Sequence, residues 1–412
     1  MISPLYARVA EHIAALRPKL VQTRRDFYMH PELSGEEERT AQVIADRLRE
    51  LGLTVQTGVG GHGVVGVLQG AHPGPGVAYR ADMDAMPIED ALETDYRSLV
   101  LGVKHACGHD VHMTVALGVA ETLAALRDVL AGTVRFIFQP AEESMEGARA
   151  MLAEDVLGKP LPDVIFALHT FPIPVGTIGL ATEVCLAGME EFIVRFYGPP
   201  ENLKVAMTRA AAALRTHINP PPTSLEAFEA LVRAMRAGEV SEREIVVSCW
   251  PLTDFPGLED CLLVLASFAS TAAQETMRAH IRAVLDAVTA ESGVSYVLTS
   301  SLGNPLLVND AAVVREVLPL LESVVGAENV WQFHSLYPYA HEDFALYLEH
   351  VPGALLWLGI ANPQKGIASL LHASDFDVDE EALVIGVQVV TRVLLHFLGL
   401  STQRLCETTQ LP

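Results

Sequence analysis

The sequence has little positive charge and few cysteines. Its 412 residues contain 28 Lys and Arg against 51 Asp and Glu, which gives a net charge of −23. A chain this acidic repels polyanions, so we expect no binding to nucleic acid or to an anionic membrane surface. The five cysteines are odd in number and widely scattered, a pattern typical of reduced thiols rather than of a disulfide framework. We therefore expect a cytoplasmic protein.

Long apolar runs are also missing. The most apolar stretch, "ALVIGVQVVTRVLLHFLGL" at 382–400, is interrupted by Gln388, Arg392 and His396 and predicts a buried terminal helix rather than a membrane span. The first residues carry charges throughout, so we expect no signal peptide and a mature chain that starts near Met1. A length of 412 residues with 50% hydrophobic content predicts a globular protein of two domains.

The spacing of apolar residues predicts an α/β fold with a mostly parallel sheet flanked by helices. Helical patterns at 5–30 and 36–53 precede short β-rich runs, and a further helical stretch covers 111–130. The expected strands are 54–59, 63–70, 76–84, 133–144 and 164–171. Strands that alternate with helices are typical of parallel sheets, in which ligands bind at the carboxyl ends of the strands.

The pattern of expected strands and helices changes near residue 187 and changes back near residue 301. The segment 187–300 has the order strand, helix, strand, strand, helix, strand, which is typical of a self-contained α+β sandwich. Prolines at 220–222 end its first helix, and a short additional helix follows them. We therefore expect this domain to be inserted as a lid into a larger domain formed by residues 1–186 and 301–412.

The stretch "HACGHDVHMT" at 105–114 gathers groups that bind metals. Cys107 and His109 lie two residues apart in a glycine-containing turn, so both side chains can converge on one cation, and this donor pair suits zinc or a related transition metal. A purely structural turn explains the spacing equally well. His105 and His112 are further candidates, either as ligands or as residues that cap the following helix or orient the ligands.

A pair of adjacent carboxylates, Glu142 and Glu143, follows the apolar strand in "FIFQPAEES". Two ionised neighbours repel each other, and a metal relieves this repulsion by binding one while the other takes up a proton. This arrangement serves metal-assisted hydrolysis, with one Glu as ligand and the other as general base, whereas the alternative is a solvated pair that opens a helix. With His169 and His372, each weak alone, the set is large enough for two metals.

Several ordered blocks of the chain resemble a known family. The sequence is similar to the metal-dependent aminoacylase and carboxypeptidase superfamily, in particular to hippurate hydrolases and to N-acyl-amino-acid and auxin-conjugate amidohydrolases. The residues that carry the resemblance are "RRDFYMHPELSGEE", "YRADMDAMPIED", "HACGHDVHMTVALG", "FIFQPAEESMEGARAML", "ALHTFPIPVGTIG", "HEDFALYLEHVPGALLWLG" and "LHASDFDVDEEAL".

This resemblance implies a zinc-exopeptidase-like catalytic domain with two divalent metal ions, zinc or manganese, and with cobalt or nickel as further options. It places the metal ligands at Cys107, His109, Glu143, His169 and His372, with Cys107 as the bridging thiolate. Glu142 would be the general base. Asp84 would support the metal site, although Asp82 could take this role instead. The implied reaction is hydrolysis of the amide bond of a small N-acyl amino acid or a related amide.

The lid departs from the family's pattern. Relatives carry, after its first strand, a glycine-rich segment with a histidine that stabilises the oxyanion, whereas this chain reads "RFYGPPENLKVAM". The arginine that closes a later strand in relatives is also missing. His217 and His341 are the candidates to replace the lid histidine. Relatives often form oligomers through this domain, so we expect a homo-oligomer, with "CLLVLASFAS" at 261–270 as an exposed edge strand.

The altered lid leaves two alternatives to amide hydrolysis. The first is a specialised biosynthetic enzyme that has the same fold and metals but acts on a different C–N bond. The second is a metal-stabilised binding protein without turnover. Both alternatives keep the metal site: the first changes the reaction, and the second has no reaction.

Overall fold

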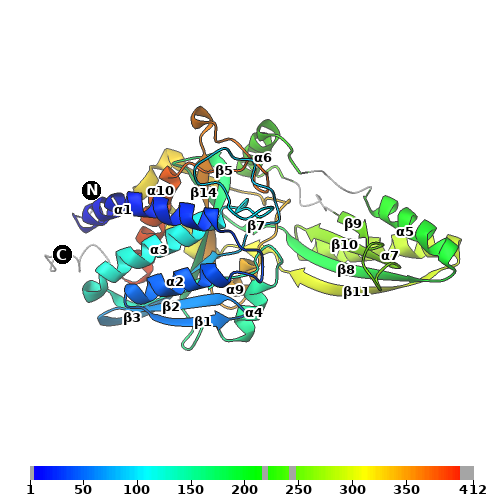
Figure 1. Ribbon diagram of the computed structural model, residues 1–412, viewed down its shortest axis with the longest axis horizontal. Coiled ribbons are helices and arrows are strands. Elements are labelled where there is room, and N and C mark those ends of the chain that lie inside the picture. Colours follow the sequence, from blue (N-terminus) through cyan, green and yellow to red (C-terminus); the bar gives the residue numbers. More distant parts are fainter. Residues whose placement is uncertain (1–3, 216–220, 241–246, 400–412) are drawn as a thin grey trace.

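The computed structural model describes residues 4–215, 221–240 and 247–399 and shows a large α/β body joined to a smaller lobe (Figure 1). The helices are α1 (Pro4–Met29), α2 (Glu38–Glu50), α3 (His109–Ala125), α4 (Gly147–Ala153), α5 (Pro200–Leu214), α6 (Leu225–Ala237), α7 (Thr271–Ser292), α8 (Ala311–Val325), α9 (Phe344–Leu348) and α10 (Glu381–Phe397). The strands of the body are β1 (Thr54–Val59), β2 (Gly63–Gln69), β3 (His72–Asp82), β4 (Ala131–Gln139), β5 (Val164–Pro174), β6 (Ile178–Ala181), β7 (Val184–Leu186), β12 (Leu307–Val308), β13 (Val330–Phe333) and β14 (Gly353–Ala361). Those of the lobe are β8 (Gly188–Tyr197), β9 (Val247–Pro251), β10 (Cys261–Phe268) and β11 (Ser295–Asn304).

The body is built on an eight-stranded sheet with the order β1-β2-β4-β3-β5-β14-β6-β13. Its centre, from β4 to β14, is parallel, and the antiparallel pairs are β1–β2, β2–β4 and β14–β6. Consecutive residues point to opposite faces of a strand, and Leu355 and Leu356 of β14 accordingly enter two different hydrophobic cores. Helices α1, α2, α3, α8 and α10 share one core, and α4, α6 and α9 share the other. The predicted mostly parallel sheet with helices on both faces is confirmed.

The smaller lobe contains a four-stranded antiparallel sheet with the order β11-β8-β10-β9, and α5 and α7 pack on it. Its elements follow the predicted order along the chain, while the domain boundaries at 187 and 300 stay predictions. The prediction of an exposed edge at 261–270 is wrong, because β10 pairs with β8 on one side and with β9 on the other. The edges of this sheet are β9 and β11, so any association through an edge would use one of those strands.

The additional helix of the insertion, α6, lies on the body rather than on the lobe. We call residues 221–240 the strap. Phe228, Val232 and Met235 of α6 are buried in the second core of the body, and Figure 1 shows α6 above the body, apart from α5 and β9. The backbone oxygen of Met235 accepts a hydrogen bond from the backbone N–H of His334 at 2.9 Å. The chain therefore leaves the lobe, packs on the body and returns to the lobe.

Among the described residues, no helix has both the length and the apolar content that a membrane span requires.

Candidate metal centre

The five predicted ligands come together although they lie on separate elements. Cys107 lies just before α3, and His109 is the first residue of this helix. Glu143 follows β4, His169 lies in β5, and His372 lies in the loop before α10. The turn between the first two requires Gly108, which has a φ of 85°. A Cβ atom at this position would lie 2.5 Å from Oγ1 of Thr170. Only glycine therefore lets the chain bring Cys107 and His109 to the same side.

The distances between the candidate donor atoms fit the ligands of divalent cations. Sγ of Cys107 lies 3.3 Å from Nε2 of His372 and 3.5 Å from Nε2 of His169. Oε1 of Glu143 lies 3.6 Å from Nε2 of His372 and 3.7 Å from Nε2 of His109. Two atoms that each lie about 2.1 Å from a tetrahedral ion are about 3.4 Å apart. Nε2 of His109 and Oε1 of Glu143 are buried and have no hydrogen-bond partner among the described residues, so a bound cation would satisfy both.

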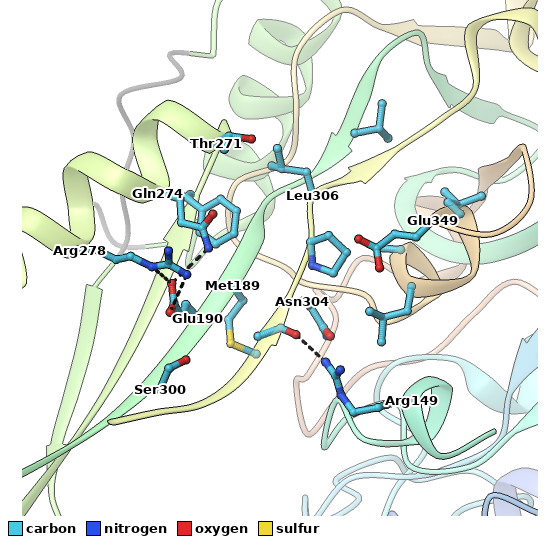
Figure 2. Close-up of a pocket in the computed structure, with 17 residues that line it drawn as sticks. Arg149, Met189, Glu190, Thr271, Gln274, Arg278, Ser300, Asn304, Leu306 and Glu349 are labelled. Atoms are coloured by element: carbon cyan, nitrogen blue, oxygen red, sulfur yellow. Dashed lines mark hydrogen bonds and ion pairs between the residues drawn. The ribbon is translucent and has the colours of Figure 1, made fainter. Parts of the chain in front are cut away.

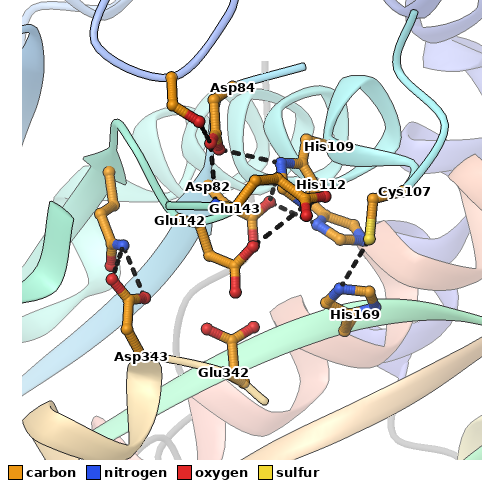
Figure 3. A network of polar contacts seen from close by, with 12 residues as sticks. Asp82, Asp84, Cys107, His109, His112, Glu142, Glu143, His169, Glu342 and Asp343 are labelled. Carbon is orange, nitrogen blue, oxygen red and sulfur yellow. Dashed lines mark hydrogen bonds and ion pairs between the residues drawn. The ribbon is translucent and has the colours of Figure 1, made fainter. Parts of the chain in front are cut away.

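Asp84 lies behind the cluster and orients two of its members. Its Oδ1 lies 3.2 Å from Nδ1 of His109, so the other ring nitrogen, Nε2, faces the glutamate pair (Figure 3). Its Oδ2 accepts hydrogen bonds from the hydroxyl of Ser34 at 2.7 Å and from the backbone N–H of Glu143 at 2.9 Å. A carboxylate in this position fixes the ring orientation of a metal-binding histidine.

His112 is close to the cluster but does not have a free nitrogen. Its Nδ1 lies 2.6 Å from Oδ1 of Asp82, and its Nε2 accepts a hydrogen bond from the backbone N–H of Thr170 at 2.8 Å. Asp82 therefore orients His112, whereas Asp84 makes the shorter contact with His109. His105 is buried and belongs to none of the metal-capable groups among the described residues. His112 does lie in such a group, with Asp82, His109 and His169, but its two contacts already occupy both of its ring nitrogens.

The electrostatics of the cluster favour a cation. Burial raises the pKa of the Cys107 thiol well above its ordinary value, and the neighbouring Glu143 and Glu142 carboxylates raise it further. Burial also raises the pKa of Glu143 to about 7. For His109, burial lowers the pKa, but the carboxylates of Asp82, Asp84 and Glu143 outweigh it and raise the pKa to about 10. These groups release their protons readily only when another positive charge replaces them.

A buried ion-pair network lies beside Glu142 and was not anticipated from the sequence. The guanidinium of Arg80 contacts Asp82, lies 2.9 Å from Oε1 of Glu342, and lies 3.0 Å from Oδ1 of Asp343. Glu142, Glu342 and Asp343 form one group of carboxylates (Figure 3). Burial raises the pKa of Glu142 well above its ordinary value, and the adjacent Glu342 and Glu143 add to this effect. The signal in the sequence was the acidic pair within the apolar segment "HEDFALYL".

A cavity of about 420 Å³ opens onto the cluster. Four of the candidate ligands, Cys107, Glu143, His169 and His372, line it together with Glu142. Aromatic and proline side chains also contribute to its lining. His341 also lines this cavity, with Nε2 2.7 Å from Oγ of Ser267 on β10 of the lobe. Burial lowers the pKa of His341 to about 4, so its ring is neutral at pH 7. The other candidate for the missing histidine, His217, lies outside the described residues.

A second cavity, of about 580 Å³, lies where the lobe meets the body (Figure 2). Both of its arginines are engaged: Nε of Arg278 donates to Glu190 at 2.7 Å, and Arg149 donates to the backbone oxygen of Gly303 at 2.7 Å. No candidate ligand lines it. The smaller cavity, which contains Glu142 and the cluster, is therefore the candidate active site.

The fold and the cluster define an α/β protein whose candidate metal centre lies beside the ends of its parallel strands. Residues 78–396 match the model of Peptidase family M20/M25/M40. The chain belongs to this family.

Named relatives cover almost the whole chain. N-acetylcysteine deacetylase of Bacillus subtilis (strain 168) is 31% identical over 391 residues, which are 91% of this chain and 95% of the relative. Thermostable carboxypeptidase 2 of Saccharolobus solfataricus is 30% identical over 409 residues, which are 95% and 99% of the two chains. The crystal structure of the Bacillus subtilis YXEP protein, described as a dinuclear metal binding peptidase from the M20 family, is 28% identical, with a TM-score of 0.71 and coverage of 94% of this chain and 99% of that one.

Proposed function

We propose that the protein is a metal-dependent amidohydrolase that cleaves the amide bond of a small N-acyl amino acid or a related amide, with Glu142 as the general base. The observation that carries the proposal is the position of Glu142. It lines the cavity, and its Oε2 lies 3.8 Å from Nε2 of His109 in the ligand cluster. The names of the relatives, among them deacetylases and carboxypeptidases, support hydrolysis of an amide bond.

In this proposal, the side chains that would hold two divalent ions are Cys107, His109, Glu143, His169 and His372. Cys107 is the proposed bridging ligand, since its sulfur faces both His169 and His372. The thiolate favours zinc, while the carboxylate and imidazole ligands also suit manganese, cobalt or nickel. When bound, the ions would supply Lewis-acid polarisation of the scissile carbonyl and would make a water molecule more acidic.

The residues of the chain provide the proton transfers. Glu142 accepts a proton from the attacking water and returns it to the leaving nitrogen, since a positioned carboxylate can act first as base and then as acid. Burial, together with the adjacent Glu342 and Glu143, raises the pKa of Glu142, which makes its carboxylate a stronger base. Asp84 holds His109 and the backbone of Glu143 in place during these steps. Arg80 keeps Glu342 and Asp343 fixed behind Glu142.

The test is Glu142→Gln, which keeps the shape of the side chain and removes the base. We expect amine release from N-acetyl, N-benzoyl and dipeptide substrates to fall by about 10²–10⁴-fold, with the content of bound metal unchanged. Glu146→Gln is the matched control, since Glu146 is exposed on the same segment. Turnover that survives in Glu142→Gln would contradict the proposed role. A fully metal-loaded wild-type protein that hydrolyses no amide would contradict the proposed reaction.

A specialised reaction at another C–N bond stays a second candidate, because the lid lacks the histidine that the family uses. The result that would favour it is a protein with two metals bound that releases no amine from any of these amides. The third alternative, a binding protein without turnover, is set aside because relatives over almost the whole chain are named carboxypeptidase and deacetylase, which are names of enzymes.

We also propose a cytoplasmic location and a homo-oligomer with no nucleic-acid or membrane partner. Cys107, Cys185, Cys249 and Cys261 are free and buried, which supports a reducing compartment; Cys406 lies outside the described residues. The exposed side chains of Trp250 on β9 and Val297 on β11 lie on the edge strands of the lobe, and these strands are the proposed contact. Light scattering measures the mass in solution, and a monomer at all concentrations would contradict the assembly.

A further inference from the structure

The charged side chains that line the 420 Å³ cavity are acidic. The carboxylates of Glu142, Glu143 and Glu342 line it, whereas no lysine or arginine among the described residues does so. His341, which is not a candidate ligand, also lines it, and burial lowers its pKa to about 4, so its ring is neutral at pH 7. A substrate in this cavity therefore lies beside carboxylates, and no described cationic side chain of the lining is there to pair with it.

The guanidinium of Arg80 lies behind these carboxylates and is fully engaged by the protein. Its side chain is 1% exposed and does not line the cavity. It contacts Asp82, lies 2.9 Å from Oε1 of Glu342 and lies 3.0 Å from Oδ1 of Asp343. Its Nε donates a hydrogen bond to Oε1 of Gln139 at 2.9 Å. One guanidinium thus faces three carboxylates, so it cannot compensate all of their charge.

The site stays negative when two divalent ions are bound. Its acidic groups are the thiol of Cys107 and six carboxylates, those of Asp82, Asp84, Glu142, Glu143, Glu342 and Asp343. Two divalent ions and Arg80 would supply five positive charges against the seven negative charges of these groups in their ionised forms, and histidines that bind a metal are neutral. Part of the excess lies on Glu142, Glu342 and Asp343, which each place a carboxylate oxygen within 4.8 Å of those of the other two (Figure 3).

Glu342 is the member of this group that links the buried network to the cavity. It contacts Arg80, its Oε1 accepts a hydrogen bond from the backbone N–H of Phe344 at 3.0 Å, and its side chain lines the cavity. The side chain is only 2% exposed. A charge acts through space, however, so Glu342 needs no free surface to attract or repel a charged group of a ligand.

We propose that this site selects amides whose leaving amine carries a neutral or cationic group in place of a carboxylate, and that Glu342 contributes to the selection. A carboxylate next to the scissile amide would lose water and gain like charges as neighbours, whereas an ammonium group would offset the excess. At an effective dielectric constant of about 20, a unit charge about 10 Å away changes affinity by roughly tenfold. The inference rests on the proposed function for the reacting bond and narrows the substrate class.

The test compares three ligands that share a carbon skeleton and differ in charge. N-acetyl-L-alanine is anionic, N-acetyl-L-alaninamide is neutral, and 1-amino-2-acetamidopropane is cationic at pH 7. Calorimetric titration into the zinc-loaded Glu142→Gln protein measures affinity without consuming the ligand, and release of acetate by the protein with Glu142 in place measures kcat/KM. We expect the neutral and the cationic ligand each to exceed N-acetyl-L-alanine by roughly tenfold or more in both measurements.

Glu342→Gln keeps the shape of the side chain and removes one negative charge. We expect it to raise the ratio of N-acetyl-L-alanine to N-acetyl-L-alaninamide by roughly tenfold, in affinity and in kcat/KM. A general loss of turnover cancels in this ratio, so a purely structural effect does not change it. Glu349→Gln is the matched control, because Glu349 is exposed and lines the second cavity, and it should leave the ratio unchanged.

Tyr339→Arg is an independent variant that keeps the test decisive if Glu342→Gln does not fold. Tyr339 is half-buried and lines the cavity, so the substitution adds a cation to the site. The ratio of N-acetyl-L-alanine to N-acetyl-L-alaninamide should rise by about threefold or more. Tyr339→Gln changes the side chain without adding charge and should leave the ratio unchanged.

The possible failures are distinct. If N-acetyl-L-alanine matches or exceeds either of the other ligands, in affinity or in kcat/KM, the inference is overturned, while its hydrolysis would leave the proposed function standing. An unchanged ratio in the folded Glu342→Gln protein, or in Tyr339→Arg, would overturn the inference as well. Weaker binding of the carboxylate than of both other ligands, without acetate release from any of them, would contradict the proposed function and support the inference.

Discussion

Asp84 and His109 connect the end of β3 to the first turn of α3 through a buried contact of 3.2 Å between Oδ1 and Nδ1. Because Asp84 also accepts the backbone N–H of Glu143, one carboxylate positions two proposed ligands. We expect Asp84→Asn to weaken metal binding by about 10–100-fold. Competition with a chromophoric chelator measures this affinity. Asp375→Asn, at an exposed position, is the control, and equal affinities in the two variants would argue against the role of Asp84.

His112 offers the opposite prediction, since both its ring nitrogens are occupied. We expect His112→Asn to bind as many metal ions as the wild type, whereas His109→Ala should lose at least one. Loss of the acceptor for the backbone N–H of Thr170 should lower the free energy of unfolding by about 1–3 kcal/mol. Elemental analysis and urea unfolding provide the two measurements. A metal ion missing from His112→Asn would show that His112 is a ligand.

His341 is the described candidate to replace the lid histidine, and its bond to Ser267 allows its role to be separated from a structural one. If His341 stabilises the oxyanion, His341→Ala should lower kcat by about 10²–10³-fold. Ser267→Ala should then have a much smaller effect, because it removes only the contact between the lobe and the body. Similar losses of kcat in the two variants would instead assign His341 to holding the domains together.

We expect the carboxylate of Asp90, which lies away from the metal centre, to make the stability of the fold depend on pH. Burial alone would raise the pKa of Asp90, but hydrogen bonds from the backbone N–H of Ser98, the ammonium of Lys104 and the backbone N–H of Leu92 outweigh it and lower the pKa. The folded state therefore holds this proton less tightly than the unfolded chain does. The stability from Asp90 is present above the unfolded pKa of about 4 and is lost as the pH falls through the lower folded value.

We expect Asp90→Asn to lower the free energy of unfolding by about 1–3 kcal/mol at pH 7 and by less near pH 3. Urea unfolding at both pH values measures the difference. Asp95→Asn should show no such trend, because its side chain is 85% exposed. A difference between wild type and Asp90→Asn that does not shrink at low pH would contradict the assignment.

The metal centre was accessible from the sequence for a physical reason. Cys107, His109, Glu143 and His169 lie at the ends of elements whose apolar patterns are strong, and the parallel sheet brings those ends together. His372 was only a weak candidate by itself, because little in its local pattern distinguishes it from a loop histidine. Which aspartate supports which histidine could not be read from the spacing, since Asp82 and Asp84 both lie at the end of β3.

Other features depend on contacts between distant parts of the chain. Arg80 and Glu342 are separated by 262 positions, and their pairing is a property of the folded sheet. The pattern of β10 is apolar because the strand is central, and the same pattern was mistaken for an exposed edge. The additional helix after the prolines at 220–222 was predicted, but the sequence does not identify the surface that α6 packs against.

The route of the strap has a consequence for attempts to take the molecule apart. A fragment cut at the two junctions of the insertion, near residues 187 and 304, would contain α6 without the surface that buries Phe228, Val232 and Met235. The remaining body would in turn expose Phe171 and Tyr337, which Phe228 covers in the intact protein. Transplanting the lobe into another scaffold therefore requires the strap to stay with the recipient body. The part of the insertion that can be transferred is then two separate segments of chain, one before the strap and one after it.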